Sequence, residues 1–265
     1  MAQQLTAEFG KHGSLQQLSW NGQQWIHPWG LEMADAHSFF SLETGGWDNH
    51  ATVLNRQTNR THGENQLKLD MREGHWQLDW GTTVTETAVR RAASFTALAN
   101  GWAMDFVMRF AFRRTAVTHA EIANQTIAWD GANYYHQYPV QSVTLFHEQG
   151  QIKIGVDTAE FPSDWQQVMY VRCSPQEDAW IVHLRLLPRQ WPREVIKLRL
   201  IGSQHAVLPS AFGRLLRLWP RLEAHLRYAG EFKRFNFGRI NAIPINFVPR
   251  YTRFTLAATV QFSGG

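Results

Sequence analysis

A period of two is the dominant pattern of hydrophobic and polar residues in this chain. Between residues 102 and 112 the even positions are apolar, whereas the odd positions include Asp105, Arg109 and Ala111. Successive side chains of a β-strand point to opposite faces, so this pattern predicts a long strand with one apolar face and one mixed face. The same alternation recurs in four further segments, at residues 76–80, 152–156, 180–186 and 254–262.

Turn-forming residues separate these alternating segments. Asn-Gly and Asp-Gly pairs occur at residues 21–22, 100–101 and 130–131. The pair Asn100-Gly101 and the bend at residues 148–150 are typical of hairpin connections between antiparallel strands. Many strands separated by short turns predict an all-β fold, a sandwich of large antiparallel sheets, and we expect residues 1–265 to form a single domain.

One segment departs from the period of two. Between Ser210 and Tyr228, leucines and Trp219 recur at helical spacing with arginines interleaved. Ser210 suits the N-cap of a helix, and Pro220 would kink or divide it. We therefore expect a minor helical segment near residues 210–228. It either closes one end of the sandwich or presents a basic surface.

The composition excludes several classes of protein. With 44% hydrophobic residues, 18% charged residues and 12 Trp, the chain can bury a substantial core, which excludes a disordered protein. Cys173 is the single cysteine, which excludes a disulfide scaffold. No apolar run approaches the roughly 18 to 20 residues that cross a bilayer. The polar start shows no signal peptide, so we expect a cytoplasmic protein with no membrane partner.

Sequence motifs for several chemistries are absent. The chain has no phosphate-binding glycine motif, no C-x-x-C, no H-E-x-x-H and no G-x-S-x-G. The 12 histidines are spread singly, without a spacing that suggests a metal site. We therefore expect no cofactor and no metal ion.

Charge is distributed unevenly around a net charge of +4. Residues 181–265 hold 14 Lys and Arg against 3 Asp and Glu, whereas residues 1–180 hold 12 against 19. Such segregation either steers an anionic partner or draws the two parts of one fold together. Basic and aromatic residues also interleave at residues 233–239, a composition that suits single-stranded nucleic acid. Because no recognisable nucleic-acid module accompanies them, we interpret these aromatics as core residues and expect no nucleic-acid partner.

Residues 133–139 are unusually rich in tyrosine and histidine. If this segment is extended, Tyr134, His136 and Tyr138 share one face. Phenol rings offer stacking surface and hydrogen bonds to a sugar, and an imidazole titrates near neutral pH. His136 and Tyr138 are therefore candidate catalytic groups, and Tyr134 is a candidate substrate-binding residue. The alternative is that these rings only pack at an edge of the sandwich.

A second group of candidates is cationic. His183 and Arg185 lie on the non-core face of one predicted strand, and Lys197 and Arg199 lie on the polar face of the next. A hairpin between these strands would join them into one surface, which Arg172 would extend. Arginine matches the geometry of carboxylate and sulfate groups. His183 is thus a third catalytic candidate and the four cationic residues are substrate-binding candidates, unless this is an ordinary solvated strand face.

His119 and Glu121 form a third group of candidates. They are two residues apart on another predicted strand and so share a face. An imidazole and a carboxylate can act as an acid–base pair where they line a cleft, so we include both as substrate-binding candidates. The alternative is an exposed strand that has no functional role.

The segment of residues 13–22, GSLQQLSWNG, is followed by Ile26-His27-Pro28 and resembles the first hairpin of galactose-mutarotase-like sandwiches. The resemblance implies a large antiparallel sandwich that binds or modifies carbohydrate on a concave sheet face. It also implies a histidine and a glutamate as the acid–base groups. No motif of that family surrounds His119, Glu121, His136 or His183.

Two functions follow from these patterns. The first is a carbohydrate-binding or carbohydrate-modifying protein whose ligand is a saccharide, acidic ones included. As an enzyme it would be a polysaccharide lyase or a sugar mutarotase or epimerase. The second is a non-enzymatic interaction module whose basic C-terminal third docks an acidic partner or another subunit, which leaves a homo-oligomer open. Convergence of His136, Tyr138 and Arg185 in one pocket would favour the first function.

Overall fold

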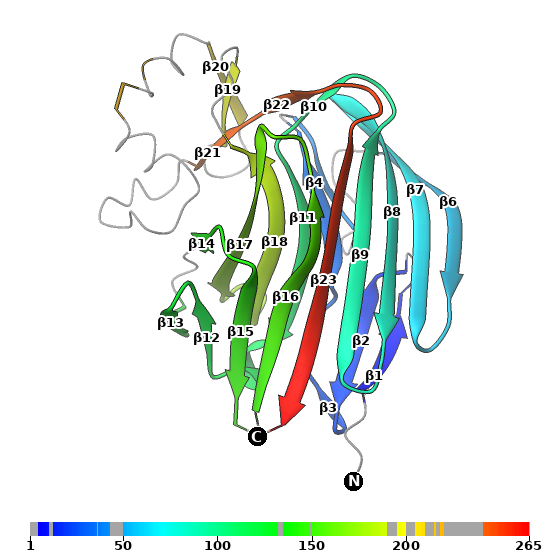
Figure 1. Ribbon diagram of the computed structural model, residues 1–265, viewed down its shortest axis with the longest axis vertical. Coiled ribbons are helices and arrows are strands. Elements are labelled where there is room, and N and C mark those ends of the chain that lie inside the picture. The colour runs from blue at the N-terminus through cyan, green and yellow to red at the C-terminus, as the bar shows by residue number, and fades with distance from the viewer. Residues whose placement is uncertain are drawn as a thin grey trace.

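The computed structural model describes residues 5–10, 13–35, 37–42, 50–131, 135–148, 150–189, 195–199, 205–209, 215, 218–219 and 241–264. Two large antiparallel sheets form a sandwich, and three smaller sheets flank them (Figure 1). A 3₁₀ turn, Arg114–Ala116, joins β11 to β12. Among the described residues, none of the helices has the length and apolar character that crossing a bilayer would require.

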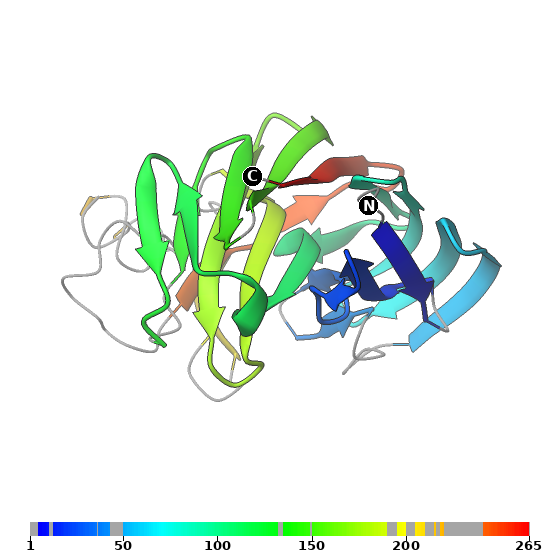
Figure 2. The ribbon, with the colours of Figure 1, turned by 90° about the horizontal axis from the view of Figure 1, so that it is seen from below.

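The larger sheet has nine strands. In spatial order they are β13 (Gln125–Ala128), β12 (His119–Ile122), β15 (Ser142–His147), β16 (Gly150–Glu160), β23 (Arg253–Gly264), β9 (Ala88–Ala97), β8 (Gly74–Val84), β7 (His62–Met71) and β6 (His50–Thr58). Figure 2 shows this sheet curving around the second large sheet.

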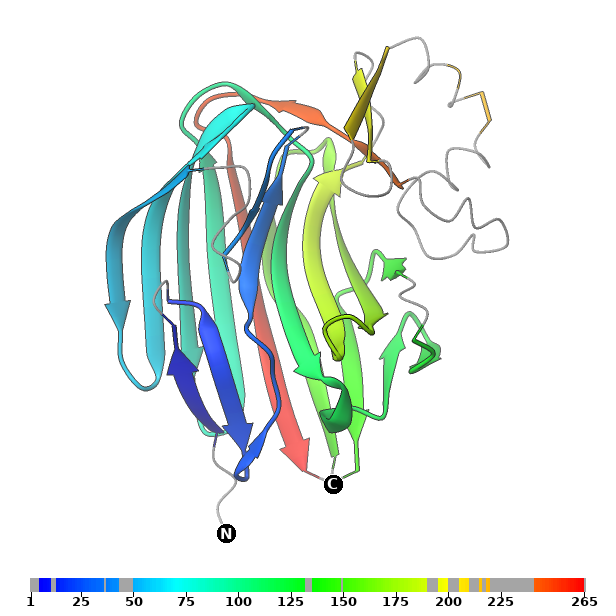
Figure 3. The same cartoon turned by 180° about the vertical axis from the view of Figure 1, so that it is seen from behind.

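The second large sheet has six strands, in the order β14 (His136–Tyr138), β17 (Trp165–Ser174), β18 (Ala179–Pro188), β11 (Asp105–Arg113), β4 (Gly30–Ala34) and β5 (Phe39–Ser41). The smaller sheets contain β1 (Leu5–Phe9), β2 (Leu15–Trp20) and β3 (Gln23–Gln24); β10 (Gly101–Ala103) and β22 (Asn246–Val248); and β20 (His205–Pro209), β19 (Val195–Arg199) and β21 (Asn241–Pro244). Figure 3 shows the six-stranded sheet from behind, with β4, β11 and β18 side by side.

The core lies between the two large sheets, where the apolar positions of the alternating segments meet. Phe106 of β11 is fully buried and joins the layers through its ring contacts. Its ring centroid lies 4.2 Å from that of Phe254 and 4.9 Å from that of Phe95, both on the nine-stranded sheet. Large aromatic side chains of this kind bury much apolar surface, which stabilises the sandwich. The predicted all-β sandwich of large antiparallel sheets is therefore confirmed.

The local predictions had mixed outcomes. The bend at residues 148–150 does connect paired strands, since β15 and β16 form an antiparallel ladder. The hairpin predicted at Asn100-Gly101 is wrong, because β9 pairs with β8 and β23 whereas β10 pairs with β22. This turn carries the chain from one large sheet toward the other. The helical segment expected near residues 210–228 lies outside the described residues except for Leu215, Leu218 and Trp219, whose side chains are exposed.

Candidate active site

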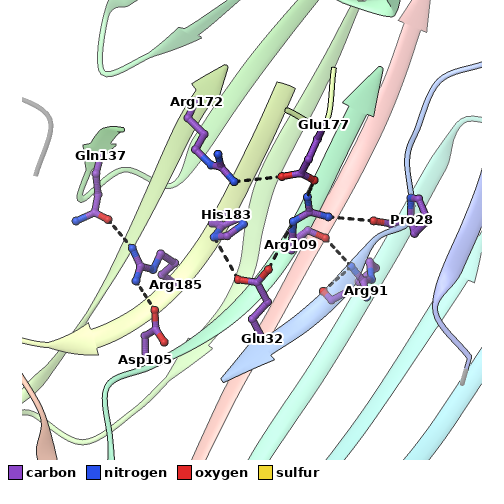
Figure 4. A network of polar contacts seen from close by, with 11 residues as sticks. Pro28, Glu32, Arg91, Asp105, Arg109, Gln137, Arg172, Glu177, His183 and Arg185 are labelled. Carbon is purple, nitrogen blue, oxygen red and sulfur yellow. Dashed lines mark hydrogen bonds and ion pairs between the residues drawn. The ribbon is translucent and has the colours of Figure 1, made fainter. Parts of the chain in front are cut away.

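Charged and polar side chains gather on the outer face of the six-stranded sheet, which points away from the core (Figure 4). The strand register aligns them in a row across the sheet. His183 of β18 lies opposite Tyr170 of β17 on one side and Arg109 of β11 on the other, and Gln137 of β14 lies opposite Tyr170. Residues from four strands thus meet on one face, although they are far apart in the chain.

A histidine and a glutamate lie together at the centre of this face. The Nδ1 atom of His183 is 4.0 Å from Oε2 of Glu32, and the other carboxylate oxygen is 3.5 Å from Nε of Arg109. The side chains of His183 and Glu32 are only 6% and 15% exposed. Glu32 therefore lies between an imidazole and a guanidinium, with little access to water.

Burial lowers the pKa of His183 well below its ordinary value, and the nearby arginines, Arg109 first, lower it further. The imidazole is accordingly neutral at neutral pH. Its Nε2 atom is buried and makes no hydrogen bond with a described residue. If Nδ1 carries the proton toward Glu32, Nε2 has a lone pair that can accept a proton or a hydrogen bond.

Tyr170 holds the imidazole from one side. Its ring centroid lies 4.3 Å from that of His183, and the guanidinium of Arg185 lies 5.5 Å from the Tyr170 ring. Burial, as the largest cause, raises the pKa of the Tyr170 phenol, so the phenol keeps its proton. This packing restricts the orientation of the imidazole.

A buried ion pair between Arg185 and Asp105 lies beside the site. Arg185 donates to the carboxylate of Asp105, and a second hydrogen bond of 3.2 Å joins it to Oε1 of Gln137. The Arg185 and Asp105 side chains are 5% and 9% exposed. A charge so far removed from water is stable only when it is paired and hydrogen-bonded, and this pair meets both conditions.

A more accessible carboxylate lies over two of the arginines. Glu177, in the turn between β17 and β18, accepts hydrogen bonds from Arg109 and, at 3.4 Å, from Arg172. Ser174 donates a further hydrogen bond to it at 3.1 Å. The Glu177 side chain is 40% exposed, in contrast to the other groups of this face. One carboxylate therefore bridges two guanidinium groups at the solvent boundary.

A buried arginine anchors the site from behind. Arg91 of β9 crosses the core and donates to the carbonyl oxygens of Gly30 at 3.3 Å and Arg109 at 3.0 Å. Gly30 and Arg109 are paired across β4 and β11, so a single guanidinium holds both strands. The backbone that carries Arg109 is thereby fixed relative to the nine-stranded sheet.

The structure brings together three of the predicted site residues. Arg172, His183 and Arg185 lie on this face, as the alternation of β17 and β18 predicted. Their assigned roles remain predictions.

His136 and Tyr138 share a face, as predicted, but it is the opposite face of the sheet. They lie across from the core residues Val171 and Met169, and the Tyr138 hydroxyl donates to Gln125 at 2.8 Å. His136, Tyr138 and Arg185 therefore do not converge in one pocket, the arrangement that would have favoured the carbohydrate function. The register with β17 directs Gln137, not its neighbours, toward Arg185. Tyr134 lies outside the described residues.

The remaining predicted residues lie elsewhere in the fold. Lys197 and Arg199 belong to β19, which pairs with β20 and β21. The predicted hairpin with the His183 strand is wrong because β17 and β11 occupy both edges of β18. His119 and Glu121 are on the nine-stranded sheet, where the His119 ring stacks on Phe146 at 4.5 Å and Glu121 is exposed.

The sequence does not single out the acidic half of the site, which comprises Glu32, Asp105 and Glu177, nor does it single out Arg109. One signal is present. Asp105 and Arg109 lie on the mixed face of a strand whose other residues are almost all apolar. Charged residues rarely enter such strands unless they are paired. No three His, Cys, Asp or Glu side chains within the described ranges gather as a metal site would require.

No family model and no curated protein matches the chain. It is similar to a solved structure of the Slr1438 protein from Synechocystis sp. PCC 6803, at a TM-score of 0.48 and 10% identity, covering 100% of this chain and 93% of that one. It is also similar to galactose mutarotase-like proteins from Lactobacillus casei (TM-score 0.48, 8% identity, 97% of each chain) and Clostridium acetobutylicum (0.47, 4%, 96% of this chain and 90% of that one).

Proposed function

We propose that the outer face of the six-stranded sheet is an active site that interconverts the anomers of an aldose carrying one anionic group. The observation that carries this proposal is the state of His183. It is buried and neutral, its Nε2 makes no hydrogen bond with a described residue, and Glu32 lies beside its Nδ1. A neutral imidazole keeps the lone pair that a general base needs near pH 7, and Glu32 lies where it can stabilise the imidazolium that forms when Nε2 takes a proton.

The reaction needs one proton to be moved from one sugar oxygen to another. His183 Nε2 takes the proton of the anomeric hydroxyl, the C1–O1 bond becomes a carbonyl, and the bond from C1 to the ring oxygen breaks. The ring oxygen then takes the proton from Nε2. Rotation about the C1–C2 bond and reversal of these steps close the ring as the other anomer. Glu32 stabilises the imidazolium that exists between the two transfers.

The position of Glu177 is the reason to propose an anionic group on the substrate. Its carboxylate bridges Arg109 and Arg172, and a carboxylate or phosphate of a sugar would present the same acceptor geometry to them. When Glu177 turns into solvent, the face holds the three cations Arg109, Arg172 and Arg185 against two carboxylates. One negative charge on the substrate would balance them. Glu177 is exposed enough for its carboxylate to turn into solvent, and the anionic group of the substrate would then replace it as the partner of the buried Arg109.

The test compares neutral with anionic sugars. We expect NMR exchange measurements to show faster anomerisation of D-glucuronate or D-glucose 6-phosphate, and a smaller effect on D-glucose and D-galactose. The variants His183→Gln and Glu32→Gln should lower the rate by about 10²-fold or more. His75→Gln, which replaces an exposed histidine of the nine-stranded sheet, serves as the matched control and should not change it. No acceleration with any of these sugars, or full activity of His183→Gln, would overturn the proposal.

Replacing Glu177 tests the substrate class separately. Glu177→Gln keeps the shape of the side chain but removes the charge that competes for Arg109 and Arg172. We expect a lower KM for the anionic sugars and no change for the neutral ones. A higher KM for the anionic sugars would show instead that Glu177 helps to bind the substrate.

A further inference from the structure

A groove on the other side of the sandwich has the features of a second ligand site. It lies on the outer face of the nine-stranded sheet, has a volume of about 380 Å³ and is lined by residues of β6, β7, β8, β9 and β23, which are neighbours in the sheet (Figure 1). Binding pockets for small ligands span roughly 300–1,000 Å³, so the groove has room for a small one. None of its lining residues belongs to the candidate active site.

The floor of the groove results from small residues at paired positions. Gly81 of β8 lies opposite Ala92 of β9, and Glu64 of β7 lies on the other side of Gly81. With almost no side chain at two adjacent positions, the sheet surface is locally hollow. The neighbouring row, in which Gln66, Asp79 and Ser94 are paired across β7, β8 and β9, forms a polar wall beside this floor.

Hydrogen bonds hold the polar side chains of that wall in place. Asp79 accepts from Gln66 at 2.5 Å and from Gln77 at 3.1 Å. Arg253 donates to the hydroxyl of Ser94 at 3.2 Å. Asp79 and Ser94 are themselves paired across β8 and β9. The groove therefore presents carboxylate, amide, hydroxyl and guanidinium groups in a fixed arrangement before any ligand binds, which lowers the cost of binding.

We infer that this groove binds a neutral saccharide unit. A pyranose ring offers several hydroxyls that donate to carboxylates and accept from guanidinium and amide groups, together with C–H surface for the Gly81 and Ala92 floor. Among the lining residues, Glu64 and Asp79 outnumber Arg253, so an anionic ligand is disfavoured. The inference is independent of the proposed function, and the two sites would select sugars of different charge.

Binding is tested with sugars that cannot anomerise. The probes are the methyl α- and β-pyranosides of glucose, galactose and mannose, titrated into the ¹⁵N-labelled full chain. We expect at least one to shift the amide signals of β7, β8 and β9 around Gly81 in a saturable manner. Methyl glycosides are not substrates for anomerisation. A negative binding result therefore does not contradict the proposed activity, and absence of that activity does not contradict this binding site. If none of the six probes shifts these signals, the inference is wrong.

A glycine substitution supplies the decisive variant. A Cβ atom at Gly81 would lie 3.6 Å from Cγ of Glu64, an ordinary contact, so Gly81→Val should fold while filling the groove. The matched control is Gly155→Val on β16 of the same sheet, where a Cβ atom would meet no atom within 4 Å. We expect Gly81→Val to weaken probe binding by at least about tenfold and Gly155→Val to leave it unchanged.

A second variant keeps the test valid should Gly81→Val fail to fold. Asp79→Asn retains the size of the wall residue but removes its charge, and it should also weaken binding. Unchanged affinity in Gly81→Val, or in Asp79→Asn where that variant is used, would overturn the inference.

Discussion

On the outer face of the six-stranded sheet, charged side chains are buried and paired with one another, whereas on the outer face of the nine-stranded sheet they are in contact with water. Arg185 and Asp105 are 5% and 9% exposed, but Arg90 and Asp157, also an arginine–aspartate pair, are 58% and 32% exposed. The residue types are the same, and the difference is desolvation. Water screens the second pair, whereas each member of the first depends on its partner.

This contrast explains why chemistry is expected on one face and reversible binding on the other. Burial among the charges of the six-stranded sheet shifts the pKa of His183 far enough to keep the imidazole neutral. The groove on the nine-stranded sheet offers fixed polar groups but is open to solvent. A shifted pKa suits a group that transfers protons, whereas preorganised hydrogen-bonding groups are sufficient to recognise a ligand.

The largest effect is expected from breaking the buried pair. Asp105→Asn would leave the Arg185 charge buried with an uncharged neighbour, so we expect the free energy of unfolding to fall by about 3–5 kcal/mol. Urea denaturation of the variant and the wild type measures this free energy of unfolding. Asp105→Asn combined with Arg185→Met removes both charges and should recover most of the loss. Equal unfolding midpoints for the wild type and Asp105→Asn would show that water reaches Arg185.

The sequence predicted the faces of strands much better than the order of strands. The period of two correctly placed Phe106 in the core and Arg109 on the other face, because alternation is a local property of one strand. The meeting of Glu32 with His183 depends on β11 pairing with β4 on one edge and β18 on the other. Such pairing joins distant parts of the chain, and a single sequence carries no local signal for it.

The segment around His136 shows a subtler limit. The sequence correctly predicted that His136 and Tyr138 share a face, but it did not determine which face. That choice depends on the register with β17, since a shift by one residue exchanges the two faces of a strand. The segment is polar on both sides, so its own pattern could not specify the register. Where one face was clearly apolar, as in β18, the prediction succeeded.

A smaller effect is expected from titrating His183. The unfolded chain has the ordinary pKa of 6.5 at this position, and the folded protein has a lower one. Below pH 6.5 the unfolded state therefore binds more protons, so the free energy of unfolding decreases as the pH falls toward the folded pKa. One such site changes the free energy of unfolding by up to about 1.4 kcal/mol per pH unit.

His183→Gln removes this contribution, so the stability of the variant should fall less steeply than that of the wild type as the pH decreases below 6.5. Urea denaturation at several pH values measures the slopes. His147, whose pKa burial also lowers, stays in both proteins and accounts for part of the remaining slope. Parallel pH profiles would mean that the folded protein protonates His183 as readily as the unfolded chain does.

The smallest effect is expected from the exposed pair on the nine-stranded sheet. Asp157 contacts Arg90 at 3.3 Å and accepts a hydrogen bond from Thr259 at 2.8 Å, and both bonds lie at the solvent boundary. Asp157→Asn makes the same chemical change as Asp105→Asn, yet we expect it to lower the free energy of unfolding by about 1 kcal/mol or less. At high salt the loss in Asp157→Asn should be smaller still, because salt screens this exposed pair in the wild type. The loss in Asp105→Asn should persist, because that pair is buried. Losses of similar size in the two variants would contradict the view that desolvation distinguishes the two faces.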